Sequence, residues 1–343
     1  MAPMRKEELH MKAAILAGYN KNGRELEIRD IPVPEPTSGE VLVHVRAAGV
    51  NPLDNMIVRG EVKLIVPYSF PLVLGNELVG VVEQVGDGVK QFAVGDRVYG
   101  RLPLAKIGAF SEYAAVRADA LAKVPDYLTD EEAACVPLTA LTALQSFELM
   151  GATAGDTVFI SGGTGSLGAM AIPIAKGLGL FVATNGNGRS EGRVRELGAD
   201  VFIDYKQQDY VDVLLDVDCV LDSLGERELE RQLSIMKPGG VLVSLRAMPN
   251  GEFARRTGQP ALKRLLFGLA GRKFDKMAAK RGQNYRFVFV HEDGAGLAAI
   301  PELLGERKLE ASVDEVFAFD DVNAALAKVA AGGSKGKTVL KIS

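Results

Sequence analysis

The chain has 343 residues, of which 47% are hydrophobic and 24% charged. These values are ordinary for a soluble globular protein, and the length suggests about two domains. The net charge of −4 comes from 40 Lys and Arg against 44 Asp and Glu, so we do not expect nucleic acid as a partner. The cysteine count of two, Cys135 and Cys219, excludes a disulfide framework and predicts buried thiols in a cytoplasmic protein.

The start of the chain and its hydropathy indicate no membrane element. Residues 1–10, MAPMRKEELH, hold no apolar run, so they are not typical of a secretory signal. We expect them to form a disordered extension. No stretch of about 18 uncharged apolar residues occurs, so we expect neither a membrane span nor a membrane partner.

Short β-type segments broken by Gly and Pro fill residues 11–130. This pattern predicts a mostly antiparallel, barrel-like β domain. The tail at 309–343 returns to such segments, and its last strand has no helix after it, so we expect the tail to rejoin this domain. The clearest segments are Val41–Arg46, Val81–Val85, Val94–Tyr99 and Tyr113–Val116.

The pattern changes near Thr129. This Thr precedes three acids and a helical apolar period, which together predict a capped helix. Continuous apolar strands then alternate with helices, which is typical of a parallel sheet buried on both faces. We therefore predict a doubly wound α/β domain at 131–308. Its expected strands are Val158–Ser161, Phe181–Asn185, Val201–Tyr205, Cys219–Leu224, Val241–Leu245 and Phe287–Val290.

Residues 246–284 are harder to interpret. They contain the basic, amphipathic stretch RTGQPALKRLLFGLAGRKFDKMAAKRGQ. A solvated face or a lid over a cleft is the favoured interpretation, and a membrane-surface or partner helix is the alternative.

The strongest motif is Gly163-Thr164-Gly165-Ser166-Leu167-Gly168, which fits G-x-G-x-x-G between a strand and a helix. In such a motif Gly163 permits the tight turn, Gly165 leaves room for a pyrophosphate, and Gly168 lets helix and strand approach. The free N–H groups at the helix start attract the anion. We therefore predict a dinucleotide site that includes Ser166 and Leu167. Pro173, inside the following helix, predicts a kink.

The second strand indicates which dinucleotide binds. Residues 177–190, GLGLFVATNGNGRS, contain no acid where NAD sites carry Asp or Glu. Asn185 takes that place, and Arg189 and Arg193 follow. A carboxylate about 4 Å from a phosphate charge would cost about 4 kcal/mol at an effective dielectric of 20, whereas Arg favours phosphate. We therefore predict NADPH (NADP), the alternative being that both arginines only begin a helix.

Several segments together resemble the medium-chain dehydrogenase/reductase superfamily, from about Met11 to Ser343. They include MKAAIL, GEVLVHVRAAGVNPLD, PLVLGNELVGVVEQVG, GGTGSLG, LGADVFIDY, KPGGVLVSL and GKTVLKI. The nearest likeness is to zinc-free quinone oxidoreductases of the zeta-crystallin type and to enone (alkenal) reductases. The resemblance implies a GroES-like domain at 11–130 and 309–343, interrupted by a Rossmann NADPH-binding domain at 131–308. It also implies an active site in the cleft between them and a homodimer.

The same resemblance implies hydride transfer from NADPH to a quinone or to the activated C=C of an α,β-unsaturated carbonyl. Asn51 matches the Asn of the N-P-x-D motif near the nicotinamide and is the one candidate catalytic residue, although capping a turn before Pro52 explains it nearly as well. Phe289 is expected on the last Rossmann strand, which in the family often joins two subunits. The further cofactor contacts that the resemblance implies are Thr139, Tyr205, Ser223, Leu224 and Leu245.

Departures from the family pattern matter as well. Zinc alcohol dehydrogenases carry Cys where Asn51 stands and G-H-E where this chain has Gly75-Asn76-Glu77, so we expect no metal. Met56 replaces a common Lys, and Tyr68 is out of register as a proton donor, so water is the expected proton source. The alternatives are a non-catalytic NADPH-binding protein, crystallin-like or regulatory, and a zinc alcohol dehydrogenase. A short-chain dehydrogenase is disfavoured, because no Tyr has Lys four residues on.

Overall fold

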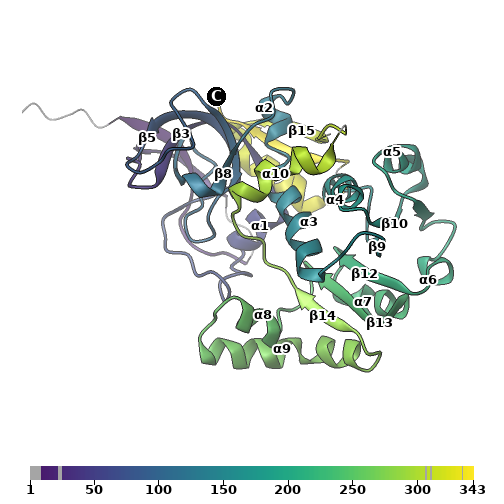
Figure 1. Cartoon of the computed structure of the whole chain (residues 1–343). Helices are drawn as coiled ribbons and strands as arrows, with labels where there is room; N and C mark the ends of the chain where they lie inside the picture. Colours follow the sequence, from purple (N-terminus) through teal and green to yellow (C-terminus); the bar gives the residue numbers. More distant parts are fainter. Residues whose placement is uncertain (1–8, 22–24, 306, 310, 334) are drawn as a thin grey trace, which may run out of the picture. The chain divides into compact units, whose positions relative to one another are not determined.

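The computed structural model describes residues 9–21, 25–305, 307–309, 311–333 and 335–343, and these form two compact units (Figure 1). Unit 1 comprises the described residues within Met1–Leu138, His291–Ala299 and Ala311–Ser343. Unit 2 comprises those within Thr139–Val290 and Ile300–Glu310. Residues 1–8 of the predicted extension lie outside the described residues.

Unit 1 is built from antiparallel β-sheets. A three-stranded sheet has the order β2-β1-β4, and a seven-stranded sheet has the order β15-β16-β3-β5-β6-β8, with β7 pairing to β3. Among the described strands of unit 1, β15 and β16 are the one pair that is parallel. The bounds are β1 His10–Leu16, β2 Glu27–Pro32, β3 Glu40–Val50, β4 Leu72–Val73, β5 Glu77–Val85, β6 Arg97–Arg101, β7 Tyr113–Arg117, β8 Leu121–Lys123, β15 Val313–Ala318 and β16 Lys337–Lys341.

The long strand β3 holds unit 1 together. It pairs with β5 and β7 and, near its end, with the C-terminal strand β16, so residues nearly 300 positions apart share one sheet. Val41, Val43 and Val45 of β3 are fully buried. The helices of this part of the chain are α1 Pro52–Val58, α2 Asp130–Ala133 and α11 Val322–Ala331, with 3₁₀ turns η1 Ala118–Ala120 and η3 Phe319–Asp321.

Unit 2 contains a six-stranded parallel sheet in the order β11-β10-β9-β12-β13-β14. The order reverses at β9, and ligands bind α/β sheets outside the carboxyl ends of the strands at such a point. The predicted α/β fold class, a doubly wound parallel sheet together with a mostly antiparallel β unit, is confirmed. The strands are β9 Thr157–Ile160, β10 Phe181–Gly186, β11 Val201–Asp204, β12 Val217–Asp222, β13 Met236–Ser244 and β14 Asn284–Phe287.

Helices bury the sheet of unit 2. From one side, Leu229 and Leu233 of α7 and Phe274 of α9 pack with Phe159 and Val220 of the strands. The glycine motif opens α4, whose stretch from Gly168 to Ala175 is buried and which runs through Pro173 without a break. The helices are α3 Pro137–Met150, α4 Ser166–Gly177, α5 Glu191–Glu196, α6 Tyr210–Val213, α7 Glu226–Ser234, α8 Gly251–Arg256 and α9 Ala261–Ala279, with η2 Gly188–Ser190. Helix α10, Gly294–Leu304, is divided between the two units.

Several expected elements differ from the structure in their bounds. The strand expected at Val241–Leu245, for example, is β13, Met236–Ser244. The last parallel strand is β14, Asn284–Phe287, so Phe289 lies two residues beyond it. Strand β6 starts at Arg97, because the preceding residues turn at Gly95, whose φ is +91°. Strand β1 begins at His10, one residue before the predicted domain start.

The helix expected after Thr129 is interrupted. Thr129 caps α2 as predicted, since its hydroxyl accepts from the Glu132 amide at 3.2 Å and its own amide donates to the Glu132 carboxylate at 2.8 Å. The chain then restarts as α3 at Pro137, where no amide hydrogen is available. By length and composition Asp130–Met150 could cross a membrane, but 83% of the most apolar window is buried, as in a core helix.

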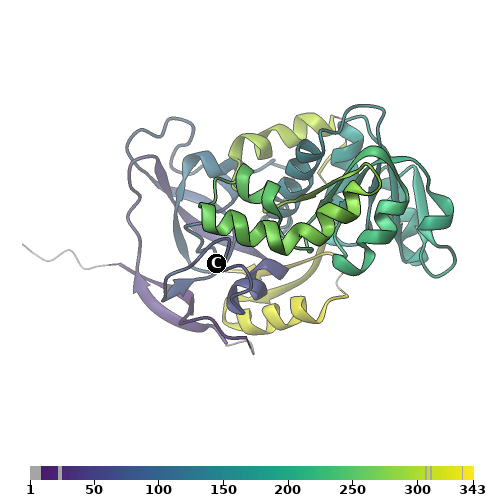
Figure 2. The same ribbon diagram turned by 90° about the horizontal axis from the view of Figure 1, so that it is seen from below.

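Residues 246–284 contain an insertion of two helices, α8 and α9, between β13 and β14 (Figure 2). The rings of Phe253 and Phe267 pack edge to face across the two helices, with centroids 5.9 Å apart. Both cysteines are buried thiols, as expected, and burial raises the pKa of each to about 12.

Candidate functional site: a dinucleotide pocket and a buried ionic cluster

The glycine loop after β9 is fixed by Asn185 at the end of β10. The Asn185 side-chain oxygen accepts from the Gly162 amide at 2.9 Å, and its backbone carbonyl accepts from the Gly163 amide at 3.0 Å. Gly165 then caps α4. Asn185 therefore positions the glycine loop.

The three motif glycines are required for different reasons. A Cβ on Gly163 would lie 2.2 Å from the Thr184 hydroxyl, and one on Gly168 would lie 2.4 Å from the Gly163 Cα. These two glycines therefore let α4 pack tightly against the loop and β10. A Cβ on Gly165 would meet only the Gly162 carbonyl, at 3.5 Å. Protein packing does not explain Gly165, whereas a ligand approaching the start of α4 does.

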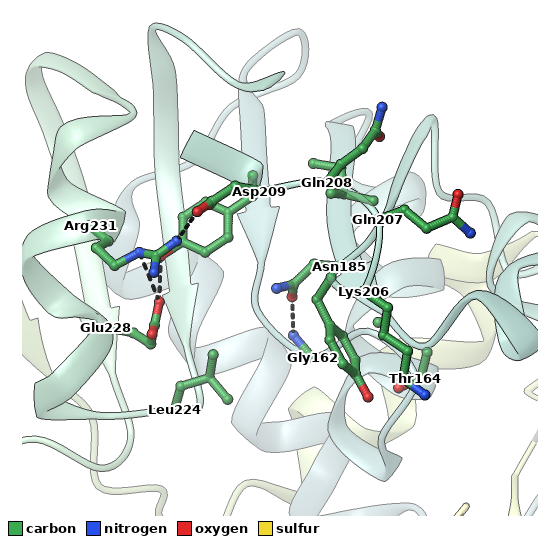
Figure 3. Close-up of a pocket in the computed structure, with 14 residues that line it drawn as sticks. Gly162, Thr164, Asn185, Lys206, Gln207, Gln208, Asp209, Leu224, Glu228 and Arg231 are labelled. Carbon is green, nitrogen blue, oxygen red and sulfur yellow. Dashed lines mark hydrogen bonds and ion pairs between the residues drawn. The ribbon is translucent and has the colours of Figure 1, made fainter. Parts of the chain in front are cut away.

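A pocket of about 540 Å³ opens at the carboxyl ends of the parallel strands of unit 2 (Figure 3). It unites three of the predicted residues, Asn185, Tyr205 and Leu224, with the glycine loop. The lining comprises Gly162, Thr164, Asn185, Gly186, Ile203, Tyr205, Lys206, Gln207, Gln208, Asp209, Tyr210, Leu224, Glu228 and Arg231.

Other predicted cofactor residues lie outside this lining. Ser223 is adjacent, because its hydroxyl donates to the Ser161 carbonyl at 2.9 Å and would lie 3.5 Å from a Cβ on Gly162. Ser166 and Leu167 are the first two residues of α4 and are half-buried. The pocket does not include Thr139, Arg189, Leu245 or Phe289.

One basic wall of the pocket was not recognised from the sequence. Lys206 lies two residues after the end of β11, is exposed, and makes no salt bridge with any residue that the structure describes. Asp204 holds this turn, because its carboxylate accepts from the Lys206 amide at 3.1 Å and the Gln207 side chain at 2.9 Å. These bonds, led by the Lys206 amide and joined by the Gly188 amide, lower the pKa of Asp204.

Asp204 therefore ties the turn after β11 to the loop after β10 that carries Arg189. Arg189 is exposed in η2 and, like Lys206, has no ion pair within the described part of the chain. The sequence feature that could have identified Lys206 is a basic residue just after the strand expected at Val201–Tyr205, in the segment IDYK.

The opposite wall already has its charge balanced. Arg231 pairs with Asp209 and lies 3.6 Å from a Glu228 oxygen (Figure 3). The Tyr210 hydroxyl donates to Glu228 at 2.7 Å, and the Arg231 guanidinium lies 5.3 Å from the centroid of the Tyr210 ring. Because two carboxylates neutralise Arg231, Lys206 is the unpaired cation among the lining residues.

A buried carboxylate fixes the loop after β12. Asp222 is fully buried and accepts from the Leu224 amide at 2.9 Å, the Gly225 amide at 3.0 Å and the Ser244 hydroxyl at 2.6 Å. The loop turns at Gly225, whose φ is +89°. Asp222 thereby sets the position of Leu224 in the pocket.

In unit 1, the candidate catalytic residue Asn51 belongs to a buried ionic cluster. Its amide nitrogen Nδ2 donates to Glu77 Oε1 at 2.8 Å and to the Gly49 carbonyl at 3.2 Å. Its Oδ1 accepts from Lys337 Nζ at 2.5 Å, and Lys337 Nζ also lies 2.5 Å from Glu77 Oε1. Both amide hydrogens of Asn51 are therefore used inside the protein.

Asp54 and its neighbours extend this cluster. Asp54 is fully buried and accepts from the Asn51 backbone amide and the Asn76 side chain, each at 2.7 Å. Burial is the largest cause that raises the pKa of Asp54 to about 7, and these two hydrogen bonds oppose it. Arg101, also fully buried, donates to the Leu102 carbonyl, and burial lowers its pKa.

The residues of this cluster do not fit a zinc ion. Zinc takes thiolate, imidazole and carboxylate ligands, whereas Asn51 and Asn76 offer amides and Glu77 Oε1 already binds the Lys337 ammonium. Within the described ranges no group of three or more His, Cys, Asp or Glu could hold a metal ion. Sequence reasoning missed Lys337. The sequence feature that could have identified it is a lysine at the start of the apolar strand KTVLK.

Neither of the other two residues considered in unit 1 is a strong proton donor. Tyr68 is half-buried, and burial raises its pKa to about 12, while its backbone amide donates to the Tyr19 hydroxyl at 2.9 Å. Met56 is half-buried on α1 and carries no polar group.

The chain is similar to known oxidoreductases over almost its whole length. Residues 37–126 match the family model for the alcohol dehydrogenase GroES-like domain, and residues 197–340 match the model for zinc-binding dehydrogenases. A Danio rerio protein named NAD(P)H oxidoreductase RTN4IP1, mitochondrial, is 32% identical over 97% of this chain and 91% of the relative. The 2-methylene-furan-3-one reductase of Solanum lycopersicum is 30% identical over 91% of this chain and 74% of the relative.

Solved structures agree with these relatives. The quinone oxidoreductase from Coxiella burnetii is 25% identical, covers 98% of this chain and 100% of its own, and superimposes with a TM-score of 0.81. A mycobacterial protein solved in complex with NADPH is 26% identical, covers 97% of this chain and 100% of its own, and has a TM-score of 0.70.

Proposed function

Because the chain belongs to the medium-chain dehydrogenase/reductase superfamily and is an NAD(P)H-dependent oxidoreductase, we propose that it reduces quinones, or the activated C=C of α,β-unsaturated carbonyls, with NADPH and without zinc. The quinone oxidoreductase and the furanone reductase among its relatives support this substrate class. The absence of a zinc-type ligand set around Glu77 and Lys337 supports zinc independence.

The observation that carries the NADPH assignment is the pair of unpaired cations beside the glycine loop. Lys206 lies in the pocket wall, and Arg189 lies on the loop that Asp204 ties to it. No carboxylate stands at the end of β10, where Asn185 is found. A 2′-phosphate would gain charge-assisted hydrogen bonds from these groups, whereas a ribose hydroxyl would gain little from them.

The chain's own residues bind and orient the reactants. When bound, NADPH supplies a hydride to the electron-poor carbon or ring of the substrate. Gly165 and the start of α4 would hold the pyrophosphate, and Asn185 keeps the glycine loop in place. Asp54 is fully buried and cannot reach a substrate, so water delivers the proton. The Asn51 side-chain amide donates both of its hydrogens within the protein, to Glu77 and to the Gly49 carbonyl. Asn51 therefore acts as a positioning residue that holds the Glu77 carboxylate, and it does not donate to the reactants.

Steady-state turnover tests this proposal. NADPH oxidation is followed with a naphthoquinone and, separately, with a short-chain enone, and we expect turnover with at least one class. Tight NADPH binding without turnover on either class would favour the non-catalytic, crystallin-like or regulatory alternative. Stoichiometric zinc in the purified protein, together with alcohol oxidation, would instead favour a zinc alcohol dehydrogenase.

A further inference from the structure

Helix α9 has two unlike faces. Phe267, Gly271, Phe274 and Ala278 recur at spacings of four, three and four, and all are buried. Gly271 fixes this contact, because a Cβ there would lie 2.4 Å from the Asn250 Cβ. This face is the one by which α9 packs onto unit 2.

Four leucines cover the opposite side of the first half of α9. The exposed fractions are 70% for Leu262, 60% for Leu265, 48% for Leu266 and 60% for Leu269. Their spacings of three and four place them on one strip of the helix surface. We call this strip the leucine ridge. Figure 2 shows α9 as a long green helix in the foreground.

Basic residues surround the leucine ridge. Residues 251–282 contain nine Lys and Arg but only two acids, in a chain whose net charge is −4. One of those acids, Asp275, accepts from the Asn250 side chain at 2.6 Å. Lys263 and Arg264 lie within the ridge segment, and further cations follow it toward the end of α9. These are Arg272, Lys273, Lys276 and Lys280.

We propose that the leucine ridge and its basic surround dock on an anionic lipid membrane surface. A helix with exposed leucines flanked by Lys and Arg inserts its apolar strip at the headgroup boundary, while the cations meet anionic headgroups. The sequence alone led us to expect no membrane partner, with a membrane-surface helix as the alternative interpretation of residues 246–284. The exposure of all four leucines is the observation that favours this alternative.

A second copy of the chain fits this surface less well. A symmetric contact places the same patch on both partners. Arg256 pairs with Glu252 and Lys273 with Glu226, so such a contact would bring the other seven cations of residues 251–282 against an equal set. The first turn of α9 contains no acid that could offset them. The surface is also separate from the dinucleotide pocket, because no α9 residue lines that pocket. The inference therefore does not rest on the proposed function.

Vesicle co-sedimentation tests the proposal with the full chain at low salt. The vesicles are phosphatidylcholine alone or phosphatidylcholine mixed with phosphatidylglycerol. We expect binding to the mixed vesicles and at least about tenfold weaker binding to phosphatidylcholine alone. The double variant Leu265→Glu/Leu269→Glu should lose binding by at least about tenfold, and Arg272→Gln/Lys276→Gln should weaken it.

Matched controls separate the ridge from general effects. Leu215, 79% exposed elsewhere in unit 2, gives the control Leu215→Glu, which should bind vesicles like the wild type. NADPH-dependent thermal stabilisation should be unchanged in every variant, which shows that unit 2 is folded. Wild-type protein that stays in the supernatant, or a ridge variant that binds normally, would overturn the proposal. It would also be overturned if sedimentation velocity showed a dimer that the ridge variant dissociates, without vesicle binding by the wild type.

Discussion

The two charged centres of this protein differ in burial and in pairing: the charges in unit 1 are buried and paired, whereas the cation in unit 2 is exposed and has no salt bridge among the described residues. In unit 1, Lys337 and Glu77 are 4% and 0% exposed and satisfy each other together with Asn51. In unit 2, Lys206 is exposed in the pocket wall and has no salt bridge among the described residues. In the first centre Lys337, Glu77 and Asn51 bind one another, although Oδ1 of the nearby Asn76 and Nε and Nη2 of Arg101 have no hydrogen-bond partner among the described residues. In the second, Lys206 faces the pocket without a salt bridge to any described residue.

This difference distinguishes charges that stabilise the fold from charges that bind a ligand. A buried ion pair holds elements together, and losing one partner leaves an uncompensated charge. A pocket cation adds little to the stability of the empty protein, but it adds affinity for an anion. Substitutions in the two centres should therefore separate stability from cofactor binding.

The largest effect should follow from Lys337→Met. It leaves the Glu77 carboxylate buried without its cation, so we expect the free energy of unfolding to fall by about 3–5 kcal/mol. Urea unfolding measures it. Lys341→Met is the matched control on the same strand, because Lys341 is 60% exposed, and it should change little. A loss at Lys337 no greater than at Lys341 would show that the cluster does not stabilise unit 1.

Asp54→Asn should change the pH dependence of stability. Burial raises the pKa of Asp54 from 3.8 to about 7, so between these values the folded chain keeps a proton that the unfolded chain has lost. Wild-type stability should therefore fall as pH rises through this window, by up to about 4 kcal/mol, and then level off. The variant should lack this contribution.

Urea unfolding from about pH 4 to pH 8 checks this window. The exposed Asp126→Asn serves as the control and should keep the wild-type slope. Parallel stability curves for wild type and Asp54→Asn would show that Asp54 does not hold a proton in the folded state.

Two neighbouring glycines should respond differently to the same change. Gly168→Ala places a Cβ 2.4 Å from the Gly163 Cα and should destabilise unit 2 by about 1–3 kcal/mol. Gly165→Ala places its Cβ in ordinary van der Waals contact with the Gly162 carbonyl, at 3.5 Å, so stability should change by less than about 1 kcal/mol while NADPH affinity falls about tenfold. Thermal unfolding and calorimetric titration check the pair. Equal losses of stability would mean that Gly165 is needed for packing and not for a ligand.

The smallest effect should come from Lys206→Gln. We expect NADPH to bind about tenfold more weakly, with NADH affinity and stability unchanged. Lys90→Gln, at an exposed position in unit 1, is the charge-matched control. Equal weakening of both dinucleotides would place Lys206 near a group that they share, such as the pyrophosphate.

Local patterns allowed much of unit 2 to be predicted from the sequence. The segment TVFISGGTGSLG holds its strand, turn and helix within a few residues, and the structure has them there. The apolar run from Phe287 to Val290 was misleading, since hydrophobicity cannot show where pairing with β13 stops. The helix break at Pro137 was missed because the apolar period continues across it.

The ionic cluster could not be predicted, because its members are far apart in the sequence. Glu77 lies on β5 and Lys337 on β16, and both strands pair with β3. A single lysine in a strand is usually an exposed residue. Only the sheet order shows that this lysine is buried beside Glu77 and Asn51.

The most direct test of the central claim is a calorimetric titration of the wild-type protein with NADPH and with NADH under identical salt. The claim is that unpaired cations beside an open glycine loop recognise the 2′-phosphate. It predicts that NADPH binds at least about tenfold more tightly than NADH. Equal affinities, or tighter binding of NADH, would contradict it.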